Sequence, residues 1–160
     1  MLTKTNLNSN IEDVEEFLQE INPRALIIES AHHPVGLYRL NEPEKILALD
    51  ALKGKTVCLF SGIGDPDSFQ DLIGHLGANI GLSFNFSDHY NYSQKDLDRI
   101  IKASQEKSVD TIITTEKDAA RLYGLRITDY GLRILVLRIE LKITKNEEGL
   151  HSRLLKLYSF

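Results

Sequence analysis

The sequence predicts an α/β fold, a mainly parallel sheet with helices on both faces. One observation is that short apolar runs rich in Val, Ile and Leu alternate with helical patterns at the spacing of βαβ units. A second is that polar or glycine-containing segments follow most of these runs, which is where such sheets carry ligand sites. No internal repeat, low-complexity tract or linker interrupts the chain, so we predict a single α/β domain over residues 1–160.

The N-terminal third is predicted to form two helices and one strand. Asn10 is a candidate N-cap for an amphipathic helix that ends at Asn22-Pro23. The apolar run in RALIIESA predicts a buried strand over residues 25–30. The segment HHPVGLYRLNEP is predicted to be a loop, and Pro43 is predicted to open a second helix.

The rest of the chain is predicted to alternate strand and helix. Asp65 and Ser93 are predicted N-caps, Pro66 suits the first helical position, and Gly77 and Gly124 indicate helix ends. The predicted strands are KTVCLFSGIG, ANIGLSFNF, KSVDTIITT and RILVLRIEL. The predicted helices are DPDSFQDLIGHLG, the segment after Ser93, EKDAARLYG and EEGLHSRLLKLY.

Composition limits the class of protein further. Of the 160 residues, 42% are hydrophobic and 26% charged, and the net charge of -4 argues against a general nucleic-acid binder. Cys58 is the single cysteine, so no internal disulfide can form, and its apolar neighbours predict a buried thiol. The polar start of the chain is unlike a signal peptide, and no apolar run approaches the ~20 residues that span a bilayer. A reducing, cytoplasmic setting fits these features.

Gly54-Lys55-Thr56 has the ending of a P-loop, but two features argue against that motif. The full pattern G-x-x-x-x-G-K-[ST] places its first glycine at position 49, which is Leu49. A P-loop also follows a strand and opens a helix, whereas here a helical pattern precedes and an apolar strand follows. Backbone N–H groups that enter a strand are committed to the sheet and cannot cradle a phosphate. We interpret the segment as a helix-to-strand turn.

The turn SGIGDPDSF follows a predicted strand and opens a helix, where free backbone N–H groups can bind an anion. Gly62 and Gly64 allow close approach of the backbone, but Asp65 and Asp67 oppose an anion. An anion site and a tight structural turn both remain open. A small Rossmann-like enzyme with another anionic ligand at the two glycines is a weaker alternative, because no ribose-binding acid follows at the expected offset.

Asp88 and His89 are adjacent in FSDHYNYS, the loop after the next strand. Histidine carries protons near neutral pH, and a nearby carboxylate can orient it. Side chains of adjacent residues rarely bond each other, so we expect their partners elsewhere. Tyr90 and Tyr92 are expected to flank a substrate or to pack locally, and an Asx-turn at Asp88 is the competing structural explanation.

The segment TTEKD stands at another strand-to-helix junction. Thr114 or Thr115 can cap the helix, and the two acids lie in the first turn, where the helix dipole favours them. This is a complete structural explanation except for Lys117, whose charge the helix N-terminus disfavours. Lys117 therefore indicates an anionic partner, either Asp88 or a phosphate.

His32 and His33 are adjacent in a predicted loop. Two adjacent histidines bind a metal ion only with ligands from elsewhere, and Cys58 is predicted to be buried, so we predict no metal site. No basic-aromatic stripe supports binding of single-stranded nucleic acid.

Three of these motifs together resemble the tetraacyldisaccharide 4'-kinase family, the lipid A 4'-kinases of Gram-negative bacteria. The family pattern is a GIG-x-P-x-x-F turn, an F-x-DHH-x-Y/F-[ST] loop, and TTEKD before a short apolar helix. The segments FSGIGDPDSF, LGANIGLSFNFSDHYNYSQKDL and TIITTEKDAARL match this pattern in order. The resemblance covers nearly the whole chain, and the DH loop combined with TTEKD is its specific part.

The resemblance implies ATP-dependent transfer of the γ-phosphoryl group to the 4'-hydroxyl of a lipid A disaccharide precursor, at the inner face of the cytoplasmic membrane. It implies a fold related to P-loop NTPases, with ATP and Mg²⁺ as cofactors of the full-length family. The family's Walker A loop and membrane-associating segment lie upstream of the matched region. The chain therefore looks like the C-terminal half of such a kinase. We expect it to need the P-loop half, in cis or in trans, and not to bind ATP tightly or turn over alone.

By the same resemblance, Asp88 and His89 are the candidate catalytic residues, with His89 tuning or positioning the proton-accepting group near the acceptor hydroxyl. The candidate residues for support of the substrate or phosphate are Gly62, Gly64, Thr114, Thr115, Glu116, Lys117 and Asp118. Tyr90 stands where the family has a second histidine. This departure leaves a second hypothesis open, a non-catalytic binding or assembly module derived from the kinase.

Overall fold

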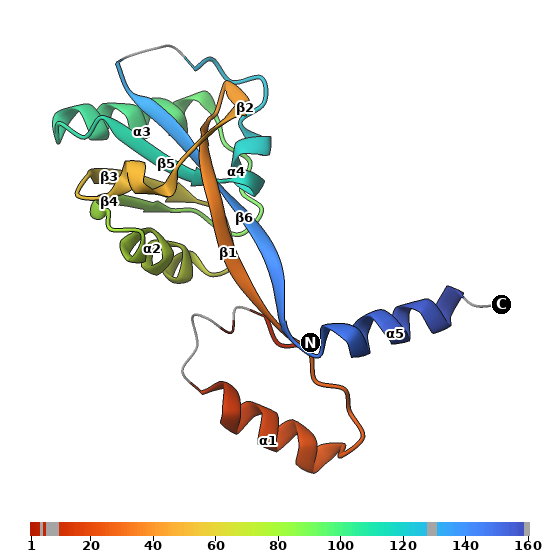
Figure 1. The fold of residues 1–160 in the computed structure, drawn as a ribbon. Helices are drawn as coiled ribbons and strands as arrows, with labels where there is room; N and C mark the ends of the chain where they lie inside the picture. The colour runs from red at the N-terminus through yellow and green to blue at the C-terminus, as the bar shows by residue number, and fades with distance from the viewer. Residues whose placement is uncertain (4, 6–9, 128–130, 159–160) are drawn as a thin grey trace. The chain divides into compact units, whose positions relative to one another are not determined.

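The structure is a computed structural model that describes residues 1–3, 5, 10–127 and 131–158. Its helices are α1 (Ile11–Ile21), α2 (Pro66–His75), α3 (Gln94–Glu106), α4 (Glu116–Arg121) and α5 (Glu147–Tyr158), with a short 3-10 helix, η2, over Leu49–Leu52 (Figure 1). Its strands are β1 (Glu29–Arg39), β2 (Glu42–Leu47), β3 (Thr56–Ser61), β4 (Asn79–Asn85), β5 (Thr111–Thr115) and β6 (Arg133–Lys145).

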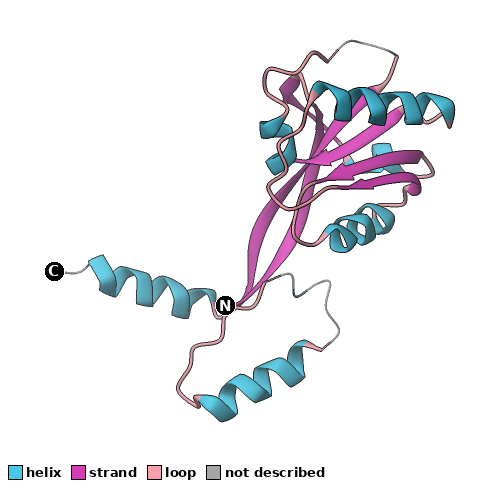
Figure 2. Ribbon diagram, turned by 180° about the vertical axis from the view of Figure 1, so that it is seen from behind, coloured by secondary structure: helices cyan, strands magenta, loops and turns pink. Residues whose placement is uncertain are grey.

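The strands form one mixed sheet in the order β2-β1-β6-β5-β3-β4. Strand β3 pairs in parallel with β4 and with β5, and β5 pairs in parallel with β6. Strands β1 and β2 form an antiparallel pair. Helices α2 and α3 lie on opposite sides of the parallel strands, as both ribbon views show (Figures 1 and 2). The predicted α/β class is therefore confirmed, with an antiparallel hairpin added at one edge.

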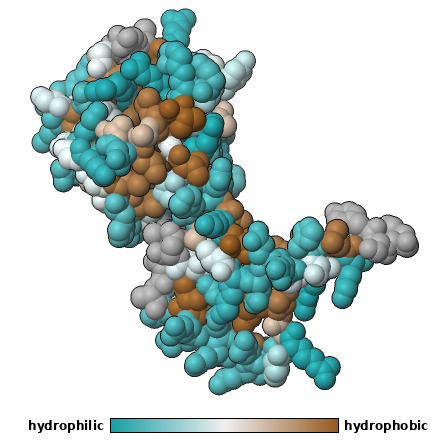
Figure 3. Space-filling model, in the orientation of Figure 1, coloured by the Kyte–Doolittle hydropathy of each residue, from teal (hydrophilic) through white to brown (hydrophobic). Residues whose placement is uncertain are grey.

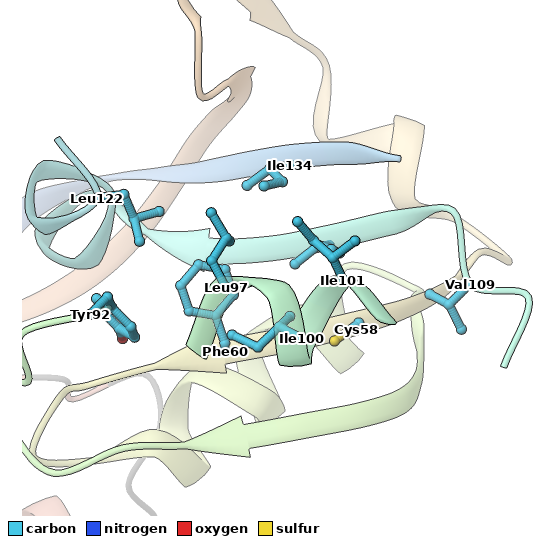
Figure 4. Packing of buried hydrophobic residues seen from close by; sticks show 10 residues of the cluster. Cys58, Phe60, Tyr92, Leu97, Ile100, Ile101, Val109, Leu122 and Ile134 are labelled. Atoms are coloured by element: carbon cyan, nitrogen blue, oxygen red, sulfur yellow. The ribbon is translucent and has the colours of Figure 1, made fainter. Parts of the chain in front are cut away.

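The main hydrophobic cluster lies between α3 and the parallel strands (Figure 4). Leu97, Ile100 and Ile101 recur at helical spacing and are all buried, so α3 has the amphipathic pattern that the sequence predicted. Each such side chain stabilises the fold by about 1.5–3 kcal/mol through burial. The fully buried residues of the cluster also include Cys58, and burial raises the pKa of its thiol. The predicted burial of this cysteine is confirmed.

Helix caps fix where the loops around α2 and α3 begin and end. The Asp65 carboxylate accepts from the Ser68 N–H at the start of α2, and Ser93 forms a capping box with Asp96 at the start of α3. Gly77 follows α2 with φ of 86°, a left-handed conformation that favours glycine. These three predicted boundaries are confirmed, and they limit the lengths of the loops that carry the polar groups of the candidate site.

The predicted elements before Thr56 are partly wrong. Strand β1 begins at Glu29, so the strand predicted over residues 25–30 is wrong for residues 25–28, although Ile27 and Ile28 are buried. The segment HHPVGLYRLNEP is not a loop, because most of it belongs to β1, and the helix expected from Pro43 is the edge strand β2. Leu37 pairs with Leu47 and Tyr38 with Ile46 across this hairpin. The pairing between segments overrides the local helical pattern. Pro43 is tolerated because an outer strand has a free edge that needs no N–H donor there.

The chain divides into two compact units, Met1–His33 with Ile139–Phe160 (unit 1) and Pro34–Arg138 (unit 2). The boundary falls inside β1 and β6, so the prediction of a single domain is not tested by this division. In unit 1, Lys145 forms ion pairs with Glu15 and Glu29, and the Asn146 side chain donates to the Ile27 carbonyl. The α1 helix has no buried residue, and apolar side chains interrupt its hydrophilic surface (Figure 3).

Candidate functional site

The candidate site lies in unit 2, at the carboxyl ends of β3, β4 and β5. Because these strands are parallel neighbours, the segments that follow them are brought together at one edge of the sheet. The Phe86 N–H donates to the Ser61 carbonyl (2.8 Å), and the Gly62 N–H donates to an Asp118 carboxylate oxygen (3.1 Å). The GIG turn, the DH loop and TTEKD are therefore in direct contact.

Asp118 is the centre of this contact, and its side chain is fully buried. One carboxylate oxygen accepts from the Gly62 N–H (3.1 Å), the Tyr92 hydroxyl (3.0 Å) and the Arg121 guanidinium (3.3 Å). The other oxygen accepts from the Thr115 hydroxyl (2.7 Å). A buried carboxylate is tolerated only when hydrogen bonds and a countercharge compensate for its desolvation, and this set of donors does both.

Asp88 and His89 form a pair with each other. His89 Nδ1 lies 2.9 Å from an Asp88 carboxylate oxygen, and the same oxygen accepts from the His89 N–H (3.0 Å). The expectation that their partners lie elsewhere is therefore wrong. The physical reason is the backbone of His89, which has φ of 60° and turns the imidazole back over the preceding carboxylate.

This pairing sets the chemistry that the DH loop can carry. Since Nδ1 faces a carboxylate, the contact favours, in the neutral imidazole, the tautomer with its proton on Nδ1, in which Nε2 is the acceptor atom. Both side chains are largely exposed, 53% for Asp88 and 74% for His89. The pair is thus a carboxylate-oriented imidazole on the surface of the described part of the chain, open to groups from outside it.

Gly62 and Gly64 have different surroundings. A Cβ at Gly62 would lie 3.1 Å from each of three atoms, the Ser87 carbonyl oxygen, Tyr90 Cβ and the Tyr92 hydroxyl, so the GIG turn packs directly on the DH loop. A Cβ at Gly64 would meet only the Asp88 carboxylate, at 3.8 Å. The Gly62 N–H is used by Asp118, so this geometry favours a bracing role for Gly62 over direct contact with a phosphate.

The start of α2 is likewise occupied by the protein's own side chains. Asp65 accepts from both the N–H and the hydroxyl of Ser68. Asp67, also in the first turn, adds a second negative charge. Of the two explanations left open by the sequence, the structure favours a tight strand-to-helix turn over an anion site there.

The other four residues of TTEKD differ in their burial and in their bonding partners. Thr115 caps α4 through the Asp118 N–H, whereas the buried hydroxyl of Thr114 has no hydrogen-bond partner among the described residues. Glu116 pairs with Arg138 of β6 (3.1 Å). Lys117 is exposed, and the structure gives it no ion pair with any described residue, Asp88 included.

Tyr90 and Tyr92 pack with Phe86, with ring centroids 4.7–5.3 Å apart. The Tyr90 hydroxyl donates to Asp96 at the cap of α3 (3.3 Å), and its hydrogen-bond partner is therefore this cap and not the Asp88–His89 pair. Tyr92 is buried; burial, and then the charge of Asp118, raise the pKa of its hydroxyl. Both tyrosines pack locally, which is one of the two roles that the sequence left open.

Sequence reasoning missed Tyr92 and Arg121 as parts of this arrangement. An available signal for Arg121 was its position three residues after Asp118, where a helix brings opposite charges together. Nothing in the sequence pattern indicated that the Tyr92 hydroxyl reaches TTEKD, because that contact joins residues 26 positions apart.

The other candidates lie outside this arrangement. Gly54 has φ of 70° in a turn before β3, and Thr56 is the first residue of that strand, which agrees with the interpretation of Gly54-Lys55-Thr56 as a turn. His32 and His33 belong to β1. Within residues 1–3, 5, 10–127 and 131–158, no group of three or more His, Cys, Asp or Glu side chains is placed to hold a metal ion.

The fold and the site together define an α/β protein of the kind that binds its ligands at the ends of parallel strands. A family model described as tetraacyldisaccharide-1-P 4'-kinase (LpxK) matches residues 5–159. The chain therefore belongs to the tetraacyldisaccharide 4'-kinase family, as its motifs predicted.

Individual relatives agree with this assignment. The chain is 31% identical over 144 residues to a tetraacyldisaccharide 4'-kinase of Halothermothrix orenii, and 37% identical over 110 residues to one of Desulfatibacillum aliphaticivorans. These matches cover 83% and 67% of this chain but only 38% and 29% of the relatives. The chain thus spans well under half the length of these kinases.

A solved structure shares the fold. It is LpxK from Aquifex aeolicus, described as an "apo" form in complex with ATP, with a TM-score of 0.52 and 23% identity. The match covers 88% of this chain and 41% of that one. No helix among the described residues is both long enough and apolar enough to cross a bilayer.

Proposed function

We propose that this chain supplies the acceptor-side part of a tetraacyldisaccharide 4'-kinase, which transfers the γ-phosphoryl group of ATP to the 4'-hydroxyl of a lipid A disaccharide precursor. The observation that carries the proposal is the exposed Asp88–His89 pair, in which Nδ1 lies against the carboxylate and Nε2 is not used in that contact. Family membership supplies the reaction class, and the pair supplies a group suited to one part of it.

In the proposed reaction, the bond between the γ-phosphorus and the leaving oxygen of ATP breaks, and a bond to the 4'-oxygen forms. The proton of the 4'-hydroxyl leaves toward His89 Nε2, directly or through a group that His89 positions. Asp88 then stabilises the positive charge that the imidazole gains. Phosphoryl transfer depends mainly on positioning and charge, so an oriented imidazole suits the acceptor side of it.

The glycine and helix-start positions that the sequence offered for a phosphate do not fit a tight ATP site. The N–H of Gly62 is bonded to Asp118, the first turn of α2 carries two carboxylates, and Gly54-Lys55-Thr56 is a turn that enters a strand. We therefore propose that ATP and Mg²⁺ are held by a P-loop-bearing part, in cis or in trans. Lys117, exposed and free of ion pairs with described residues, is the candidate in this chain for contact with the anionic substrate.

The proposed setting is the cytoplasmic side of the inner membrane, where a lipid substrate would be presented. The apolar side chains of α1 are available for a further surface, since Phe17 is 61% and Ile21 67% exposed. In this proposal they pack against the P-loop-bearing part and do not span the bilayer.

The test is complementation in trans. The chain is mixed with a separately made P-loop half, and transfer of labelled phosphate to the 4'-hydroxyl of the disaccharide is measured. We expect activity only with both parts, and a fall of about 100-fold or more for His89→Ala, the range of general-base contributions. His75→Ala is the matched control, because His75 is also exposed but lies at the end of α2.

Two results would contradict this proposal. Robust Mg-ATP hydrolysis by the pure chain would show that it holds its own nucleotide site. Absence of phosphoryl transfer from a folded chain and an active P-loop half would favour the second hypothesis, a non-catalytic module. Tyr90 is the observation behind that second hypothesis, because it stands where the family has a second histidine and its hydroxyl is bonded to Asp96 at the α3 cap.

A further inference from the structure

Asp118 occupies a position from which it can govern the geometry of the Asp88–His89 pair without touching either residue. Its carboxylate is fully buried and receives donors from all three motif segments. Of the seven support candidates in the sequence, it is the one whose side chain is hydrogen-bonded to both of the other segments. With no exposed oxygen, it cannot act as a direct ligand of substrate or phosphate.

Two connections lead from Asp118 to the DH loop. On one side, Asp118 holds the Gly62 N–H, and the Gly62 carbonyl accepts from the His89 N–H (3.1 Å). On the other side, Asp118 holds the hydroxyl of Tyr92, three residues beyond His89 (3.0 Å). The loop that carries His89 is thus linked to one buried carboxylate in two places, directly at Tyr92 and through Gly62 at His89.

The backbone conformation of His89 is one that depends on such connections. A left-handed φ of 60° is costly for a residue with a side chain, and it persists only where surrounding contacts impose it. The Nδ1 contact with Asp88 exists because of that conformation. Arg121 strengthens the arrangement, since it contacts both the Asp118 carboxylate (3.3 Å) and the Gly62 carbonyl (3.4 Å).

We infer that Asp118 is a positioning residue: through Gly62 and Tyr92 it holds His89 in the left-handed conformation that places Nδ1 on Asp88. The catalytic consequence of this inference rests on the proposed function, whereas the structural part does not. Tyr92 and Arg121 are then members of the site, although neither faces the acceptor. The buried unpaired Thr114 hydroxyl has no place in this network and is left without a role.

The experiment measures His89 in the isolated full chain by NMR. Exchange of the His89 amide and the nitrogen chemical shifts of its ring, which report the tautomer, are compared between the wild type, Asp118→Asn and Tyr92→Phe. We expect amide protection to fall about tenfold or more in Asp118→Asn, as for loss of a hydrogen bond to a charged group, and the Nδ1–H tautomer to lose its preference. Tyr92→Phe removes one hydroxyl and keeps the ring, so it should give a smaller change in the same direction.

Asp71→Asn is the control, because it removes the same charge from an exposed position on α2. Unchanged exchange and tautomer in folded Asp118→Asn would overturn the inference. If Asp118→Asn does not fold, unchanged values in Tyr92→Phe overturn it instead. In complementation assays the inference also requires that Asp118→Asn has a lower kcat than the wild type, with little change in the KM for ATP. Failure of wild-type complementation would count against the proposed function alone, since the NMR result stands without it.

Discussion

Replacement of Gly62 by alanine tests the close packing of the GIG turn on the DH loop. The new methyl group would lie 3.1 Å from the Ser87 carbonyl oxygen, Tyr90 Cβ and the Tyr92 hydroxyl, which approach it from one loop. None of these atoms is the far end of a free side chain: one is backbone, one adjoins backbone, and the hydroxyl is bonded to Asp118. The neighbours must therefore each give way by a few tenths of an ångström, and the contact cannot relax at one point alone.

The size of the effect follows from two opposing contributions. Overpacking of one methyl group in a close-packed region costs about 1–3 kcal/mol. Because φ at Gly62 is not in the left-handed region, alanine adds no backbone strain, and the reduced freedom of the unfolded chain returns about 0.4–1 kcal/mol. We expect a net loss of about 1–2 kcal/mol in the free energy of unfolding.

The assay is urea unfolding of the full chain, followed by circular dichroism, with Gly74→Ala as the matched control. Gly74 lies in α2, and a Cβ there would meet nothing within 4 Å, so alanine should stabilise the chain by about 0.5–1 kcal/mol. The two variants are thus expected to move in opposite directions. If Gly62→Ala is as stable as the wild type while Gly74→Ala gains stability, the reasoning from close packing is refuted.

Two further predictions concern a helix cap and a titration. Asp65→Ala should lower the unfolding free energy by about 1 kcal/mol in the same urea assay, because it removes the N-cap of α2, and a loss no larger than that of Asp67→Ala would contradict this. For Tyr92, the pKa in the folded chain lies above its ordinary value of 10.0, so its contribution to stability is present below about pH 10 and is lost as the pH rises further. Tyr92→Phe should therefore flatten the decline in unfolding free energy above pH 10, and equal slopes for the two proteins would show that Tyr92 is not responsible.

The sequence predicted the elements from Thr56 to Arg121 well because their signals are local. Asp65, Ser93 and Thr115 accept from backbone groups three residues ahead, so each cap can be read within one turn. The apolar residues of α3 recur with helical period, and the runs in β3 and β5 are buried throughout or nearly so. Where every local preference agrees with the final packing, pattern alone is sufficient.

The hairpin of β1 and β2 escaped prediction for the opposite reason. Pro34, Gly36 and Pro43 read locally as loop and helix-start signals, but the strands form through contacts between segments. A Cβ at Gly36 would lie 2.5 Å from a methyl carbon of Ile46, so the glycine lets the two strands approach. This is a property of the pair, and neither segment contains it alone.

In the site, motif positions were predictable but the division of roles among them was not. The alternation of strands indicates that the GIG turn, the DH loop and TTEKD meet at one edge. That Asp88 pairs with its own neighbour depends on the left-handed turn at His89, which no composition rule predicts. Similarly, a place in the first turn of a helix was a sufficient explanation of Asp118 from the sequence. It gave no reason to expect that the carboxylate also binds two other loops.

On the short helix α4, Asp118 is buried and Lys117 is exposed. This difference limits what each of the two residues can contribute to the site. Asp118 faces inward, where desolvation would make its charge untenable without Gly62, Tyr92 and Thr115. Lys117 faces outward at a helix N-terminus that opposes its charge, and no described carboxylate compensates it. A residue with a purely structural role would not be expected to carry that charge there. Within the proposed function, Asp118 therefore stabilises the site and Lys117 contacts an anionic substrate. The sequence TTEKD alone does not distinguish these two roles.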